Sequence, residues 1–195
     1  EYLGNDREAI GGEKAGIIRA GRAVICGEPE PPDSILNRAR ELGSPVYRLG
    51  HEFSIVAHAN GCTWRQGARV LELPRPVMQG AHQVNNMATA VAAVMAVHPD
   101  SLDRQPLLAK GLSAVQLPGR LQQHASCQRV WLDVGHNPHA AKAVADALHS
   151  MDIRPAICVL GMLHDKDAAA VAETLDGSVQ AWYCAGLEGA RGRTG

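Results

Sequence analysis

Apolar and polar positions in the first part of the chain predict short helices and strands in alternation. Residues 5–18 have the spacing of an amphipathic helix, and residues 22–26 form a short apolar run that is typical of a buried strand. A helix over 34–42 is expected after Pro31-Pro32, and a second short strand at 46–48.

The next region predicts a β-hairpin followed by a buried helix. Residues 53–73 alternate between apolar and polar positions and are interrupted at Asn60-Gly61, a pair that favours the tight turn of a hairpin. Residues 87–97 are rich in Ala and Val on every face, which is typical of a helix buried on all sides. A short helix over 107–112 and a linker at 116–119 complete this part.

Beyond residue 120 the expected order is strand, helix, strand, helix, strand. Apolar runs place the strands at 130–132, 156–160 and 180–184, and amphipathic segments place the helices at 138–150 and 167–175. Short loops between such elements predict a parallel sheet with right-handed crossovers. Three strands make an incomplete Rossmann-like sheet, so the predicted fold class is α/β.

Composition and charge exclude several classes of function. The chain has 195 residues, enough for one large or two small domains, and its 46% of hydrophobic residues support a packed core. A net charge of -1 gives no broad basic field for nucleic acid, and no apolar run approaches the ~20 residues of a membrane span. The five cysteines lack metal-binding spacing and the N-terminus lacks a signal-peptide layout, so we expect a cytoplasmic protein with reduced thiols.

The sharpest local pattern is Trp131-Leu132-Asp133-Val134-Gly135-His136-Asn137-Pro138. An apolar strand ends in Asp133, and Asn137 and Pro138 are residue types that open helices. We therefore expect Asp133 and His136 at the carboxyl edge of a parallel sheet beside a helix N-terminus, where open α/β sheets bind ligands and anions are favoured. On local grounds alone, a turn-capping Asp133 and a merely exposed His136 are an equal alternative.

Lys14 is the second candidate. It lies between small residues and the apolar pair Ile17-Ile18, and a lysine in partly desolvated surroundings loses proton affinity. A neutral lysine amine can take up CO₂ as a carbamate, which gives oxygen ligands of the kind that Mg²⁺ prefers. Without further evidence, a solvated lysine paired with a nearby glutamate is the more common arrangement.

Asn86 and Arg120 are weaker candidates. Asn86 precedes the Ala-rich helix, and its amide offers both a donor and an acceptor to an adenine edge, although an N-cap role is the simpler one. Arg120 follows the turn Pro118-Gly119 and has the fork geometry that suits a phosphate, although a lone linker arginine usually has no such role.

Taken together and in this order, these segments resemble the folylpolyglutamate synthase/dihydrofolate synthase family of the Mur ligase superfamily, most closely its bifunctional bacterial type. The resemblance covers essentially the whole chain. Its most specific blocks run from Asp133 to Ala141 and from Gly161 to Asp167. The other matching segments are 3–10, 13–17, His82-Gln83 with Asn86, Gly119-Arg120 and 182–192.

The resemblance implies roles residue by residue. Lys14 matches the lysine that relatives carry as a carbamate near a Mg²⁺ ion, and His136 matches the histidine near the incoming glutamate and the phosphates. Asn86, Arg120 and Asp133 match residues that bind ATP. The resemblance leaves the role of Lys166 open.

The implied reaction adds L-glutamate to dihydropteroate, or to folate poly-γ-glutamate, through an acyl phosphate made from ATP. Residues 1–117 would be the back part of a P-loop-type central ATPase domain, and residues 118–195 the front part of a Rossmann-like glutamate-binding domain. The intact enzyme would be a cytoplasmic monomer in folate metabolism that uses ATP and Mg²⁺ and binds neither nucleic acid nor membranes.

The chain also departs from the family pattern. No G-x-x-x-x-G-K-[ST] phosphate loop occurs in it, and the family's serine, glutamate and histidine ligands of Mg²⁺ would lie upstream of Glu1. The chain is therefore expected to be a fragment that is inactive alone. Two alternatives stay open, namely a Mur-type ligase that adds an amino acid to a cell-wall precursor and a non-catalytic, truncated nucleotide-binding module.

Overall fold

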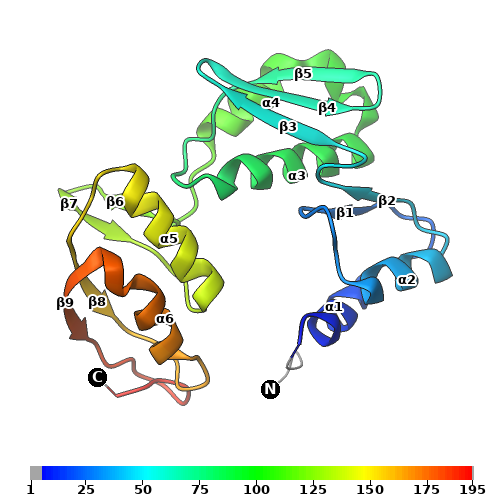
Figure 1. Ribbon diagram of the computed structural model, residues 1–195. Coiled ribbons are helices and arrows are strands. Elements are labelled where there is room, and N and C mark those ends of the chain that lie inside the picture. The colour runs from blue at the N-terminus through cyan, green and yellow to red at the C-terminus, as the bar shows by residue number, and fades with distance from the viewer. Residues whose placement is uncertain (1–5, 195) are drawn as a thin grey trace. The chain divides into compact units, whose positions relative to one another are not determined.

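The computed structural model describes residues 6–194, except for the side chains of residues 101–103. The start of the first matching segment, Leu3-Gly4-Asn5, lies outside the described residues. The chain divides into two units (Figure 1). Unit 1 comprises Glu1–Val77 and Gln83–Val115, and unit 2 comprises Met78–His82 and Gln116–Gly195.

Unit 1 begins with two helices and a small parallel sheet. Helix α1 (Arg7–Ala15) starts at the N-cap Asp6, whose carboxylate accepts a hydrogen bond from Ala9 N at 2.7 Å. Strands β1 (Val24–Cys26) and β2 (Val46–Arg48) pair in parallel, with helix α2 (Asp33–Glu41) between them in the sequence. These elements confirm the predicted order, and they share a small core made of Ala15, Ile18 and Ala39.

A three-stranded antiparallel sheet follows, in the order β3 (Ser54–His58), β4 (Gly61–Gln66) and β5 (Arg69–Leu73). The predicted hairpin is confirmed, but its two-residue loop is 59–60 rather than Asn60-Gly61, because His58 pairs with Gly61. The second hairpin turns at 67–68, where Gly67 has a φ of +57° that suits a residue without a Cβ.

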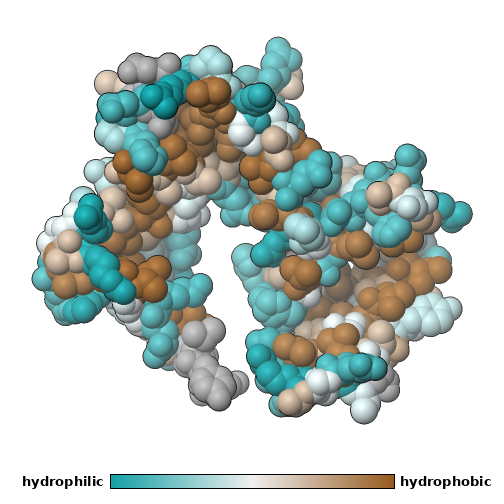
Figure 2. Space-filling model, turned by 180° about the vertical axis from the view of Figure 1, so that it is seen from behind, coloured by the Kyte–Doolittle hydropathy of each residue, from teal (hydrophilic) through white to brown (hydrophobic). Residues whose placement is uncertain are grey.

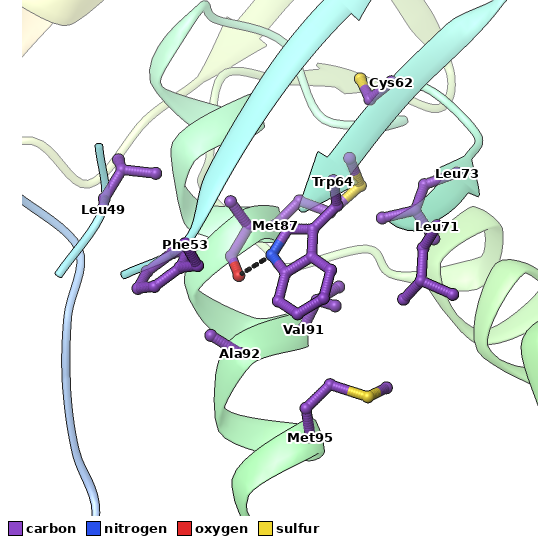
Figure 3. Packing of buried hydrophobic residues seen from close by; sticks show 11 residues of the cluster. Leu49, Phe53, Cys62, Trp64, Leu71, Leu73, Met87, Val91, Ala92 and Met95 are labelled. Carbon is purple, nitrogen blue, oxygen red and sulfur yellow. Dashed lines mark hydrogen bonds between the residues drawn. The ribbon is translucent and has the colours of Figure 1, made fainter. Parts of the chain in front are cut away.

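Helix α3 (His82–Val97) packs on one face of this sheet (Figures 1 and 3). The sequence predicted its start at Met87, five residues too late, because polar residues at 82, 83, 85 and 86 hide an apolar spacing that begins at Val84. The fully buried Trp64 donates its indole N–H to the carbonyl of Ala88 at 3.1 Å (Figure 3). The buried residues of this core are Leu49, Phe53, Cys62, Trp64, Leu71, Leu73, Met87, Ala88, Val91, Ala92 and Met95.

The short 3₁₀ helix η1 (Pro99–Arg104) and helix α4 (Gln105–Ala114) close unit 1. Leu108 and Leu112 of α4 pack against the same core. In the described part of the chain, no helix has the length and hydropathy needed to cross a bilayer.

The strands β6 (Gln122–His124) and β7 (Cys127–Leu132) of unit 2 form an antiparallel hairpin. The predicted three-stranded parallel sheet is wrong in this detail, because among the described residues β7 pairs with β6 and only two later strands pair in parallel. The sequence Gln122-Gln123-His124 is polar and exposed, so it carries no apolar alternation that would predict a strand.

The rest of unit 2 follows the predicted alternation. Helix α5 (Pro138–Ser150), strand β8 (Ala156–Leu160), helix α6 (Ala168–Leu175), the one-turn η2 (Asp176–Ser178) and strand β9 (Val179–Cys184) come in that order, and β8 pairs with β9 in parallel. Together they bear out the α/β fold class. Residues of α5 and α6 pack with Leu160 and Trp182 into a second core.

Apolar side chains also reach the surface (Figure 2). On the paired strands β8 and β9 these include Ile157, Val159 and Tyr183, of which Val159 is 70% exposed. Because Val159 and Tyr183 are cross-strand partners, they belong to the face of this sheet that α5 and α6 do not cover in the described residues.

Candidate functional site

Asp133 ties two turns of unit 2 together. It follows β7, and its Oδ2 accepts the backbone N–H of Leu121 at 2.8 Å while its Oδ1 accepts that of Gly135 at 2.6 Å. Val134 N–H also donates to the carbonyl of Gly119 at 2.9 Å. The turn that carries Arg120 is therefore fixed to the turn that carries His136, although the two lie far apart in the sequence.

The turn that precedes Arg120 needs glycine at position 119. Gly119 has a φ of +67°, and a Cβ there would lie 2.6 Å from Cγ1 of Val134. Leu121 has a φ of 44°, a left-handed conformation that is rare outside glycine and that the hydrogen bond to Asp133 supports. Between them, Arg120 is exposed, and no described side chain forms an ion pair with it. Its guanidinium is thus available to an anion.

His136 lies at the start of α5. Its Nδ1 is 3.0 Å from the carbonyl oxygen of Val134, so Nδ1 carries the proton and Nε2 is left as an acceptor when the ring is neutral. Asn137 caps α5 by accepting the N–H of Ala140 at 2.9 Å, and Pro138 occupies the first helical position, as predicted. The exposed imidazole thus lies next to a helix end that favours negative charge.

Lys14 lies in the last turn of α1 in unit 1 and is exposed. The expected desolvation of this lysine is therefore wrong for the described residues, because Gly11, Ala15 and Ile18 occupy the inward face of the segment and leave Lys14 beside it. No described carboxylate lies within ion-pair distance of its ammonium, so the alternative of a paired lysine is not found either.

Asn86 lies inside α3, on its exposed side, and not at its N-cap. Its Nδ2 donates to Oε1 of Gln83 at 3.1 Å. The amide keeps one N–H and its carbonyl oxygen for other partners, which is the donor and acceptor pair that an adenine edge requires. Lys14 and Asn86 belong to unit 1, whereas Arg120, Asp133 and His136 belong to unit 2.

Ion pairs and hydrogen bonds connect the two loops at the carboxyl ends of β8 and β9. Asp165 accepts from Nη2 of Arg191 at 2.7 Å and lies 3.3 Å from the ammonium of Lys166. The Arg191 guanidinium holds the pKa of Asp165 down at about 2. Arg193 adds hydrogen bonds to the carbonyls of His164 and Lys166, at 3.1 and 3.0 Å.

Sequence reasoning missed this role of Arg191 and Arg193. The available signal was that 160 and 184 end neighbouring parallel strands, so that the following loops share one edge of the sheet.

The described residues do not form a magnesium site. No group of three or more His, Cys, Asp or Glu side chains among them is placed to hold a metal ion. Lys14 as an unmodified lysine is a cation and supplies no oxygen ligand, and even as a carbamate it would be one ligand where Mg²⁺ needs six. A hollow of about 560 Å³ in unit 1, lined by Tyr47, His51 and Arg69 among others, contains none of the predicted site residues.

Comparison with known proteins shows what the chain is similar to. Residues 119–195 match the Mur ligase glutamate ligase domain. The dihydrofolate synthase/folylpolyglutamate synthase of Escherichia coli (strain K12) is 38% identical over 196 aligned residues, which cover 100% of this chain and 45% of the relative. The chain thus spans about half the length of the curated relatives that it matches.

Solved structures of similar proteins give the same result as the sequence comparison. A bifunctional folylpolyglutamate synthase/dihydrofolate synthase with Mn, AMPPNP and L-glutamate bound is 37% identical with a TM-score of 0.81, covering 100% of this chain and 46% of that one. FolC of E. coli in complex with DHPP and ADP is 35% identical with a TM-score of 0.83, covering 99% and 46%. By sequence and by fold, the chain is therefore a homologue of the bifunctional dihydrofolate synthase/folylpolyglutamate synthases, and its residues 119–195 match the Mur ligase glutamate ligase domain.

Proposed function

We propose that the chain is part of an ATP-dependent ligase that joins the amino group of L-glutamate to the carboxylate of dihydropteroate or of a folate. The observation that carries the proposal is the alignment of the whole chain with bifunctional synthases, together with the hydrogen bonds of Asp133 that link the turn of Arg120 to the turn of His136. One relative binds AMPPNP and L-glutamate and another binds DHPP and ADP, which are the partners such a reaction needs.

The proposed reaction has two steps. The γ-phosphoryl group of ATP moves to the carboxylate and gives an acyl phosphate, and the glutamate amine then attacks the carbonyl carbon and displaces phosphate. Phosphoryl transfer depends mainly on positioning and on neutralising charge. Arg120 has an exposed guanidinium with no described counter-ion, so it is suited to bind a phosphate oxygen.

His136 suits the second step. A glutamate ammonium must lose a proton before its nitrogen can attack, and Nε2 is the ring nitrogen that the hydrogen bond to Val134 leaves as an acceptor. Asn86 would bind the adenine edge through the amide groups that Gln83 does not use. Lys14, as a carbamate, would contribute a single ligand to a divalent cation.

The domain assignment is also part of the proposal. Residues 1–117 would be the back part of the central ATPase domain and residues 118–195 the front part of the glutamate-binding domain. The family match at 119–195 supports the second assignment.

The test is a coupled assay of ADP release with dihydropteroate or tetrahydrofolate, ATP and L-glutamate, run on the 195-residue chain and on any longer reading frame that contains it. We expect no turnover from the chain alone and glutamate-dependent turnover from the longer protein. Arg120→Ala should lower kcat about 100-fold, the loss typical of removing one charge-stabilising group.

Two outcomes would refute the proposal. Turnover with UDP-muramoyl substrates instead of pterins would indicate a cell-wall ligase. Nucleotide binding without ligation by the longer protein would indicate a non-catalytic module.

A further inference from the structure

Glu8 of α1 caps helix α2 from outside that helix. Its Oε1 accepts the backbone N–H of Asp33 and its Oε2 accepts that of Ser34, both at 3.0 Å. Helix α2 has Pro32 at its N-cap position, and Pro32 forms no side-chain cap. Because the first N–H groups of a helix lack partners within it, Glu8 supplies what the α2 sequence cannot. The same two N–H groups lower the pKa of the Glu8 carboxyl group.

Further contacts of Glu8, Gly11 and Arg7 fix α1 to this region. Ser34 Oγ donates to the carbonyl oxygen of Glu8 at 3.0 Å, so the link between the two helices runs in both directions. Gly11, one turn after Glu8, lies so close to Pro32 and Ser34 that an added Cβ would clash with both. Arg7 forms an ion pair with Glu28 at 2.8 Å and also donates to the carbonyl of Glu30.

Lys14 is at the border of this contact face. At about 100° per residue, it lies about 60° around the helix from Gly11 and less than one turn beyond it. The direction of its side chain therefore depends on how α1 is rotated on α2. Glu8 and Gly11 leave that rotation little freedom, because the carboxylate must reach two adjacent N–H groups while the glycine stays against Pro32.

We infer that Glu8 is a positioning residue, which holds α1 on α2 and thereby sets the direction in which Lys14 is presented. This inference rests on the proposed function for the role of Lys14, but not for the contact itself. Glu8 touches no reacting group; it acts through the helix. Nothing in the sequence alone distinguishes Glu8 from Glu13, the other glutamate of α1, which is exposed and whose carboxylate forms no hydrogen bond or ion pair with a described residue.

The first arm of the test uses hydrogen exchange in the 195-residue chain. Glu8→Ala should speed exchange of the Asp33 and Ser34 amides and of the α1 amides about tenfold, while Glu8→Gln, whose single amide oxygen accepts one of the two bonds, should lie between it and the wild type. Glu13→Ala is the matched control, and we expect it to leave both sets unchanged. Equal exchange in Glu8→Ala and the wild type would overturn the inference.

The second arm measures kcat and KM in a longer reading frame that shows ligase turnover. Glu8→Ala should lower kcat about tenfold or more with KM for ATP within about twofold of the wild type, because a small misplacement of a catalytic group slows the chemical step more than binding. Partial rescue by Glu8→Gln supports the positioning role. An equal loss in Glu13→Ala, or a fall only in thermal stability, would overturn it. A wild-type protein without turnover would refute the proposed function, and the exchange arm would still decide the contact.

Discussion

The two adjacent glycines of α1 allow the packing of this helix to be measured directly. A Cβ at Gly11 would lie 2.5 Å from Ser34 Oγ and 2.6 and 2.8 Å from two ring carbons of Pro32, whereas a Cβ at Gly12 would meet no atom within 4 Å. Both glycines are inside the helix, so changing either to alanine gains the same helix propensity of about 1 kcal/mol. Only Gly11→Ala also overpacks a rigid neighbour, which typically costs about 1–3 kcal/mol.

The two substitutions should therefore change the free energy of unfolding differently. Gly12→Ala should stabilise by about 0.5–1 kcal/mol. Gly11→Ala should be neutral or destabilise by up to about 2 kcal/mol, since the overpacking of about 1–3 kcal/mol exceeds or equals the propensity gain. The difference between the two variants isolates the packing term, because the propensity term is common to both.

Urea unfolding followed by far-UV circular dichroism measures this difference, and amide exchange in α1 and α2 localises it. Because the chain has two units, each unfolding transition must be assigned to one of them. Trp64 lies in unit 1, whereas Trp131 and Trp182 lie in unit 2. Equal stabilisation by both substitutions would refute the reasoning, since it would mean that Gly11 does not lie against Pro32 in solution.

Three further predictions concern stability. Asn137→Ala removes the cap of α5 and should destabilise unit 2 by about 1 kcal/mol in urea unfolding, whereas Asn137→Asp should not. Trp64→Phe loses the buried bond to Ala88 and should destabilise unit 1 by about 1–3 kcal/mol, with no change in the unit 2 transition. The Arg48 side chain holds the pKa of Glu52 down at about 2, compared with 4.5 unfolded. Its contribution is therefore present above the unfolded pKa and lost as the pH falls from 4.5 towards 2, so wild type and Glu52→Gln should converge in stability over that range.

Local chemistry predicted several elements with accurate bounds. The pair Asn137-Pro138 specifies both the cap and the first residue of α5, and the helix starts at Pro138 as expected. The apolar run Ala156–Leu160 is bounded by polar or loop-forming residues, and β8 has those bounds. In both cases the signal lies within the element itself, so no distant residue is needed to read it.

The pairing of strands that are separated in the sequence could not be predicted from the sequence. The polar segment Gln122–His124 becomes a strand only because β7 offers it a partner, and neither its composition nor its burial indicates one. Lys14 was expected in apolar surroundings because Ile17 and Ile18 follow it. Ile18 is buried, but Ile17 is 79% exposed, and Lys14 is exposed as well. The apolar residues that follow Lys14 in the sequence therefore do not surround it in space, because Ile18 lies on the buried side of this segment and Lys14 does not.

Asp133 shows that a residue proposed for a ligand site can also have a structural role. The resemblance suggested a nucleotide contact, yet both carboxylate oxygens already accept backbone N–H groups, next to Arg120 on one side and next to His136 on the other. Each oxygen keeps a further lone pair, so a ligand contact and a structural role are compatible. Loss of activity in Asp133→Ala therefore would not identify a nucleotide contact, because the same change releases the two turns that hold the other candidate residues. Only a measurement that separates them, such as amide exchange at Leu121 and Gly135 beside nucleotide affinity, assigns the loss to one role.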